Sequence, residues 1–199
     1  MSIVQGDLLA ALKQRYDEPQ RHYHSWAHIE ALLRHFETIK SKLNDPDAVL
    51  VALYWHDAIY DPMAGDNEAK SADLMLEEAQ GLLPEDRLKL ADTIIRATAT
   101  HTVPEGLSAA DQSDLELFLD IDLSILATPK AVFDQYEQDI RKEYAHVPID
   151  LYGQGRSAVL TRFLERERLY FSDGFFSKWE QTARTNLQTS IKLLSKLET

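Results

Sequence analysis

Two histidines and two aspartates in the first two thirds of the chain have the side-chain chemistry of a metal site. They are His28, the adjacent pair His56 and Asp57, and Asp122. Two imidazoles and two carboxylates suit a first-row divalent metal such as Mn, Fe, Co, Ni or Zn, and they leave coordination positions open for water. We therefore predict that these four residues bind a divalent metal cation.

The segments around these residues are expected to be helices that meet in one core. His28 begins an amphipathic segment with apolar residues at helical spacing, so its side chain is expected at the rim of the core. Residues 48–55 are apolar on every helical face, which is typical of a helix buried on all sides, and they run directly into His56. Residues 115–126 are similarly apolar around two aspartates.

Charge inside these apolar segments is the strongest physical indication of a site. Asp57 follows the first of them, and Asp120 and Asp122 lie in the second. A carboxylate buried without a partner loses several kcal/mol of hydration, so it must be paired, protonated or bound to a metal. Ligands projecting from several helices into one core are a known arrangement of metal sites in helical bundles.

Composition limits the other classes of site and partner. The 199 residues include no cysteine, which excludes disulfides, thiolate nucleophiles and Cys-based zinc or iron–sulfur sites. The formal net charge of −12 argues against a nucleic-acid polymer as partner, because such a partner needs a basic surface. The sequence has no recognisable secretory signal or membrane span, which predicts a cytoplasmic protein that does not bind membranes.

The apolar spacing is helical along nearly the whole chain, and strict alternation is almost absent. The predicted helices cover residues 6–16, 27–43, 47–60, 67–81, 85–100, 112–127, 130–146, 155–170 and 175–197. Helix starts are marked by Asn44 to Asp47, Asp66, Pro84 and Thr128-Pro129, and helix ends by Gly81, Gly106 and the pair Gly153 and Gly155. We predict one all-α domain over residues 1–199, with a metal-site core at about 20–127 and C-terminal helices 130–197 packed on that core.

The four candidate ligands resemble the defining pattern of the HD superfamily of metal-dependent phosphohydrolases. That pattern is a His, then a His-Asp doublet, then a distant Asp, all on helices of an all-α core. Here the doublet ends the hydrophobic helix as Ala-Leu-Tyr-Trp-His56-Asp57, and the last ligand lies in Ile121-Asp122-Leu123. The similarity covers about residues 20–127 and implies an HD-type helical bundle of about nine helices.

The whole chain is similar to a bacterial branch of this superfamily known only as predicted HD phosphohydrolases. The further motifs are Arg21-His22-Tyr23-His24 and Ile140-Arg141-Lys142-Glu143-Tyr144. The resemblance implies His28, His56, Asp57 and Asp122 as ligands of a divalent cation, with Mn, Fe, Co, Ni, Zn and Mg as candidates. Two alternatives stay open: His24, four residues before His28, shares its face if the helix begins early, and Asp120 competes with Asp122.

Two further residues are candidates for catalysis through the same resemblance. Asp61 follows Asp57 by four residues, so we expect it one helical turn on and on the same face. In the branch that hydrolyses guanosine tetraphosphate, an acidic residue at this position helps the reaction, although that branch has Glu where this chain has Tyr60. Asp61 would orient or deprotonate the attacking water; the alternative is an ordinary turn residue before Pro62.

His101 is the second catalytic candidate. It is expected at the end of the helix that includes residues 93–100, where some HD enzymes place an extra His that assists the leaving group or binds a second metal. The alternative is a solvated histidine favoured by the helix dipole.

Basic residues are candidates for contacts to a phosphorylated substrate. Residues 1–140 include 11 basic and 26 acidic side chains, whereas residues 141–199 include 10 and 7. Arg and Lys contact anions through bidentate or point-charge interactions. The predicted substrate-binding residues are Arg21, His24, Arg141, Lys142 and Arg156; a solvated surface is the alternative for the last three.

Together these patterns predict a metal-dependent phosphohydrolase that acts on a small phosphorylated compound, with nucleotides as the first class to consider. One alternative is a non-catalytic module that binds metal or nucleotide. Another is an HD-type di-iron oxygenase, which uses extra histidines between the doublet and the last Asp, where this chain has only His101. A homodimer built on the C-terminal helices is also open.

Overall fold

The computed structural model describes residues 3–197, which form nine α-helices and no β-strand. The helices are α1 (Gly6–Tyr16), α2 (Trp26–Ile39), α3 (Pro46–Trp55), α4 (Asn67–Glu78), α5 (Glu85–Ala97), α6 (Ala109–Asp122), α7 (Lys130–Glu143), α8 (Ile149–Leu164) and α9 (Asp173–Leu194), with short 3-10 helices η1 (Lys40–Lys42) and η2 (Leu123–Ala127). The prediction of an all-α fold with about nine helices is confirmed. Among the described residues, no helix is both long and apolar enough to cross a membrane.

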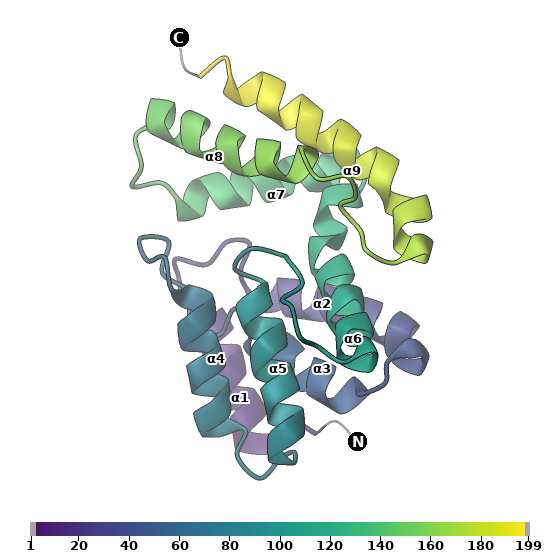
Figure 1. The fold of residues 1–199 in the computed structure, drawn as a ribbon. Coiled ribbons are helices and arrows are strands. Elements are labelled where there is room, and N and C mark those ends of the chain that lie inside the picture. Colours follow the sequence, from purple (N-terminus) through teal and green to yellow (C-terminus); the bar gives the residue numbers. More distant parts are fainter. Residues whose placement is uncertain (1–2, 198–199) are drawn as a thin grey trace. The chain divides into compact units, whose positions relative to one another are not determined.

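Residue contacts divide the chain into two compact units after Ile121. The first contains α1 to α5 and all of α6 except its last residue, and the second contains η2 and α7 to α9 (Figure 1). The net negative charge of the sequence falls on the first unit, which has ten basic and 22 acidic side chains, whereas the second has 11 of each. That both units belong to one domain stays a prediction.

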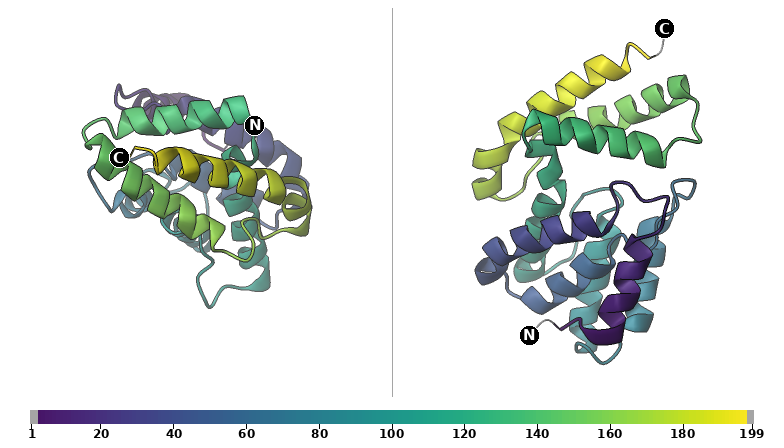
Figure 2. Two further views of the ribbon diagram at one scale, coloured as in Figure 1. Left: turned by 90° about the horizontal axis from the view of Figure 1, so that it is seen from above. Right: turned by 180° about the vertical axis from the view of Figure 1, so that it is seen from behind.

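Helix α3 is the centre of the first unit. It packs against α2, α4 and α5, and all eight residues from Ala48 to Trp55 are buried, as their uniform apolarity predicts. The helix begins where the sequence indicates, because the Asp45 side chain accepts a hydrogen bond from the Ala48 N–H at 2.9 Å and Pro46 occupies the first turn. In the same unit, Arg15 of α1 pairs with Glu78 of α4 at 2.8 Å. Figure 2 (right) shows these two helices in the view from behind.

Helix α3 ends at Trp55 rather than at residue 60 as predicted, because a side chain distant in the sequence hydrogen-bonds to a backbone carbonyl in its last turn. The Tyr54 carbonyl, which would accept from the Ala58 N–H in a continued helix, instead accepts from the Tyr16 hydroxyl at 3.0 Å. The Ala58 N–H donates to the Trp55 carbonyl at 2.9 Å and closes a turn. The His-Asp doublet therefore lies in a turn at the end of α3 and not inside a helix.

The predicted helix end at Gly153 and Gly155 is wrong, since both glycines lie inside α8. The helix begins at Ile149 after Pro148, and the Tyr152 N–H donates to the Pro148 carbonyl at 2.8 Å. A glycine inside a helix costs about 1 kcal/mol relative to alanine, which tertiary packing can offset. Gly81 does follow the end of α4 closely, whereas Gly106 lies in the loop between α5 and α6; both have left-handed φ angles, of 81° and 87°.

In the second unit, α9 packs along α8 and over η2, and Figure 2 (left) shows α9 between α7 and α8 in projection. Buried polar side chains fix η2 in place. Asn186 of α9 donates to the carbonyls of Leu126 and Thr128 at 2.8 and 2.9 Å, and the Tyr170 hydroxyl donates to the Leu123 carbonyl at 2.9 Å. Buried amide and hydroxyl groups thus satisfy the carbonyls of the short helix.

Asp114 of α6 is fully buried and is a polar anchor that the sequence did not indicate. Its carboxylate accepts from the backbone N–H groups of Asn44 and Asp45 at 2.8 and 2.6 Å, and from the Asn44 side chain at 3.1 Å. These bonds hold the loop that begins α3 against α6. Hydrogen bonds to a charged group are among the stronger polar contacts in proteins.

Replacing Asp114 should therefore destabilise the fold. We expect Asp114→Ala to lower the free energy of unfolding by about 2–4 kcal/mol, because it removes a buried charged acceptor and leaves the N–H groups of Asn44 and Asp45 without it. Urea denaturation followed by circular dichroism measures this change. Gln112→Ala, at an exposed site on the same helix, is the control and should stay within about 0.5 kcal/mol of the parent; equal effects of the two variants would contradict the anchoring role.

Candidate metal centre

Three of the four predicted ligands converge in the structure. Ligand atoms of His28 in α2, His56 at the end of α3 and Asp122 at the end of α6 all lie within 4.8 Å of one another. His28 and His56 are buried, with 8% and 1% of their surfaces exposed, and Asp122 is partly exposed. The structure therefore supports a group able to hold a metal ion.

The fourth ligand, Asp57, approaches the same histidines. Its Oδ2 atom lies 3.1 Å from His56 Nε2 and 3.8 Å from His28 Nε2, and the two Nε2 atoms are 3.2 Å apart. Ligand atoms bound to one ion at about 2.1 Å are separated by about 3.0–3.4 Å when they are neighbours in its coordination shell. Two of the three separations have this size, so this part of the side-chain arrangement fits a divalent cation.

The protonation of His56 agrees with a ligand role. Its Nδ1 atom lies 2.9 Å from the Leu53 carbonyl, which can only accept a hydrogen bond, so Nδ1 carries a proton. In the neutral imidazole, Nε2 then presents its lone pair to His28 and Asp57. Metal-binding histidines commonly donate the other ring N–H to a carbonyl in this way.

The electrostatics around Asp57 favour a charged carboxylate. Burial alone raises its pKa, but the positive charge that His56, His24 and His28 have when protonated, together with a hydrogen bond from His56, outweighs burial and holds the pKa well below its usual range. The carboxylate is therefore ionised beside a protonated His56, and without that proton it faces the Nε2 lone pair of His56. A cation shared between these atoms, whether a proton or a metal ion, stabilises the arrangement.

Arg21, predicted to contact substrate, holds the backbone of the doublet. Its side chain is fully buried, and the guanidinium donates to the carbonyls of Asp57 at 2.6 Å and Ala58 at 2.9 Å. It also donates to the His24 carbonyl at 3.1 Å. These bonds fix the backbone turn from which the Asp57 side chain projects, and a substrate contact by Arg21 stays a prediction.

Tyr16 supports the same turn from the other side and was not identified from the sequence. Its hydroxyl accepts from the Asp57 N–H at 3.3 Å while donating to the Tyr54 carbonyl. The rings of Tyr16 and Tyr60 lie 5.1 and 5.5 Å from the Arg21 guanidinium carbon, within the range of cation–π attraction. No local pattern could reveal this role, since Tyr16 and Asp57 are 41 residues apart.

The two alternative ligands lie outside the converging group. Helix α2 begins at Trp26, so His24 is not on the helical face of His28. The His24 ring stacks on Tyr60 at 4.2 Å, and its proximity to Asp57 contributes to the lowered pKa of that carboxyl. Asp120 is fully buried on α6, but it is not part of the group that contains Asp122.

The predicted catalytic residues lie in turns rather than in helices. Asp61 is exposed, and its Oδ1 accepts from the Met63 N–H at 2.9 Å, while its backbone pairs with the Asn67 side chain. Because α3 ends before the doublet, the argument that Asp61 shares a helical face with Asp57 does not hold. His101 follows the end of α5 with a left-handed φ of 50°. Both catalytic roles stay predictions.

The remaining predicted substrate contacts belong to the second unit. Arg141 donates to the carbonyls of Tyr144 and Val147, and Lys142 pairs with Asp139 at 2.7 Å. Arg156 is largely buried between α7 and α8, where it donates to the Tyr136 hydroxyl at 2.7 Å and to Glu137 at 2.5 Å. Proximity of the acidic groups raises the pKa of Arg156 despite its burial, so this pair is ionised.

Comparisons with known proteins do not assign the chain to a family. No protein-family model, no curated protein and no solved structure matches it. The similarity to the HD superfamily therefore stays a prediction that rests on the four residues and their helical context.

The converging ligands predict metal binding that can be measured directly. We expect protein stripped with a chelator to bind one Mn²⁺ or Co²⁺ ion per chain and to melt at a higher temperature when loaded, because the ion binds only the folded state. Isothermal titration calorimetry and elemental analysis give affinity and stoichiometry. His56→Gln and Asp122→Asn should each weaken binding more than about tenfold, whereas His22→Gln, at an exposed site, should not; equal binding by all three would exclude this centre.

The contacts of Arg21 predict that it supports the centre indirectly. Arg21→Lys keeps the charge but cannot reach both carbonyls, so we expect a lower melting temperature and a roughly 10- to 100-fold loss of Mn²⁺ affinity, the range seen for groups that orient ligands. The matched control is Arg15→Lys, at a partly exposed ion pair on α1. Unchanged metal affinity in Arg21→Lys would refute the positioning role.

Proposed function

We propose that this protein is a metal-dependent phosphohydrolase acting on a small phosphorylated compound, with nucleotides as the first substrate class to test. The supporting observation is the convergence of His28, His56 and Asp122, with Asp57 beside the histidines, at the ends of buried helices. The ligand chemistry, two imidazoles and two carboxylates, leaves positions open for water and substrate. We further propose that the enzyme acts in the cytoplasm, as the sequence predicts.

In this proposal His28, His56, Asp57 and Asp122 hold a divalent cation. When bound, such a cation lowers the pKa of a coordinated water and polarises a phosphoryl oxygen. The Leu53 carbonyl fixes the orientation of the His56 ring, and Arg21 fixes the backbone of Asp57. These contacts preorganise the ligands, so little reorganisation is needed when a cation binds.

The chain's own acids and bases have proposed roles in proton transfer. Asp61 uses Oδ1 in its turn, which leaves Oδ2 to accept a hydrogen bond from the attacking water. His101 would donate a proton to the leaving group, and His24 would contact the substrate phosphate. A di-iron oxygenase is less well supported, since residues 58–121 include no histidine other than His101.

An assay with a panel of substrates tests the proposal. Metal-stripped protein is reconstituted with Mn²⁺, Co²⁺, Ni²⁺ or Mg²⁺ and incubated with nucleoside mono-, di- and triphosphates, cyclic nucleotides and sugar phosphates. We expect phosphate release or diester cleavage that depends on metal and falls at least about 100-fold in Asp57→Asn. The control is Asp7→Asn, at an exposed site on α1.

The outcomes separate the candidate functions. Hydrolysis that survives in Asp57→Asn at the parental rate would refute this centre as the catalytic site. A rise in melting temperature with a nucleotide, without product from any substrate, would favour a binding module. Two irons per chain with oxygen uptake would favour the oxygenase.

A further inference from the structure

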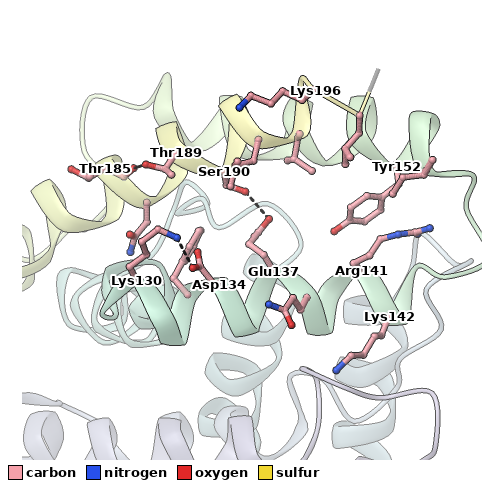
Figure 3. Close-up of a pocket in the computed structure, with 17 residues that line it drawn as sticks. Lys130, Asp134, Glu137, Arg141, Lys142, Tyr152, Thr185, Thr189, Ser190 and Lys196 are labelled. Carbon is pink, nitrogen blue, oxygen red and sulfur yellow. Dashed lines mark hydrogen bonds and ion pairs between the residues drawn. The ribbon is translucent and has the colours of Figure 1, made fainter. Parts of the chain in front are cut away.

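A groove between α7 and α9 in the second unit shares no residue with the candidate metal centre. It has a volume of about 830 Å³ and is lined by residues of α7, α8, α9 and the segment after α9 (Figure 3). This volume falls within the range of small-molecule sites in proteins. All lining residues belong to the unit that follows Ile121.

The groove has an apolar surface that is unusually exposed. Phe133 and Leu194 are buried along it, whereas Ile149, Leu193 and Leu197 line it with 47%, 52% and 40% of their surfaces exposed. Among the described residues, six large hydrophobic side chains are exposed, and these three are half of them. Their concentration at one groove indicates a surface that gains stability when an apolar group covers it.

Tyr152 supplies an unused hydrogen-bond donor at the groove. The residue is 6% exposed, and its buried hydroxyl has no hydrogen-bond partner among the described residues. Figure 3 shows the ring reaching from α8 toward the space between α7 and α9. Burial raises the pKa of Tyr152 to about 12, so the hydroxyl keeps its proton at neutral pH and can donate a hydrogen bond to an acceptor. A buried donor without an acceptor is unfavourable, and an acceptor on a ligand would relieve this.

Arg141 supplies a positive charge at the same end of the groove. Its guanidinium carbon lies 4.7 Å from the Tyr152 ring centre, and the guanidinium donates to the backbone carbonyls of Tyr144 and Val147. Within residues 3–197, no carboxylate forms an ion pair with it. A guanidinium with uncompensated charge beside an apolar surface is a natural partner for a carboxylate.

The net charge of the residues that line the groove also favours a carboxylate ligand. Four basic and two acidic residues line the groove, in a protein with a net charge of −12. Both acids are already engaged: Asp134 pairs with Lys130, and Glu137 accepts from Arg156 and from the Ser190 hydroxyl. The groove therefore favours an anion over a cation.

We propose that this groove binds a small amphipathic monocarboxylate, with its alkyl chain along the leucines of α9 and its carboxylate at Arg141 and the Tyr152 hydroxyl. The Ser190 hydroxyl donates to Glu137 at 2.8 Å and so links α9 to α7 across the groove. A hydrogen bond that bridges the two helices disfavours insertion of a partner helix, which is about 10 Å wide, and favours a thinner extended chain. Phe133 and Arg141 are about 12 Å apart along α7, which matches a chain of medium length.

Three probes with the same alkyl chain test the recognition of charge. Decanoate, decanol and decyltrimethylammonium are titrated into the full-length protein below their micelle concentrations, and binding is measured by calorimetry. We expect decanoate to bind at least tenfold more tightly than decanol, and the cation to bind most weakly. Acetate, which has the carboxylate without the chain, should not bind. Equal binding of decanoate and decanol would overturn the proposed role of Arg141 and Tyr152.

Tyr152→Phe is the cleanest variant, because the hydroxyl that it removes has no partner in the fold. We expect unchanged or higher thermal stability together with roughly tenfold weaker decanoate binding, the loss of one hydrogen bond to a charged group. Parental decanoate affinity in Tyr152→Phe would overturn the proposed contact.

A matched pair of variants tests the location of the alkyl chain. Leu193→Glu places a charge in the groove, whereas Leu151→Glu places one outside it at a leucine of similar exposure, 54% against 52%. We expect Leu193→Glu to abolish decanoate binding and Leu151→Glu to retain it. Light scattering of the parent checks self-association: a dimer that Leu193→Glu dissociates, without decanoate binding in the parent, would instead assign the groove to a second copy of the chain. Because this experiment needs no metal or turnover, its failure is distinguishable from failure of the phosphohydrolase proposal.

Discussion

The first unit places proton-accepting atoms against one another in a largely buried setting, and this constraint explains much of its architecture. When His56 is neutral, its Nε2 lone pair points toward the carboxylate of Asp57 and the Nε2 atom of His28. Such an arrangement is unfavourable unless a cation neutralises it, because the surrounding helices offer little solvation. Buried hydrogen bonds on the backbone of the surrounding structure hold these atoms close together.

Those hydrogen bonds act on the backbone of the turn rather than on the ligand side chains. Tyr16 donates to the Tyr54 carbonyl, which would accept the next hydrogen bond of α3 if the helix continued. Arg21 donates to the carbonyls of Asp57 and Ala58. His56 itself keeps helical dihedral angles, with φ −56° and ψ −34°, so the chain leaves the helix after the first member of the doublet. Asp114 has a similar role at the other end of α3, where it fixes the loop that precedes the helix.

The sequence predicted what depends on local pattern and missed what depends on distant contacts. The bounds of α1, 6–16, were predicted correctly, and so were the complete burial of residues 48–55 and a helix start at residues 44–47, where Asp45 caps α3. The convergence of His28, His56 and Asp122 followed from charge inside apolar segments. Neither the end of α3 nor the start of α8 could be predicted in this way. The first is set by Tyr16, 38 residues from its acceptor, and the second by packing that tolerates two glycines inside a helix.

Charge distribution constrains what the metal centre can recognise. Two neutral imidazoles and two carboxylates balance the charge of one divalent ion, and the first unit around them has 22 acidic and ten basic side chains. An anionic substrate therefore gains no long-range attraction from this unit. Arg21 does not change this balance, because its buried guanidinium pairs with Glu18 at 3.0 Å and donates to backbone carbonyls. In the proposed phosphohydrolase, recognition of the phosphate would then come from short-range contacts, namely direct coordination and hydrogen bonds from neutral donors, which strengthen when water is excluded. Such a site would discriminate by geometry at the reacting phosphoryl group rather than by the total charge of the substrate.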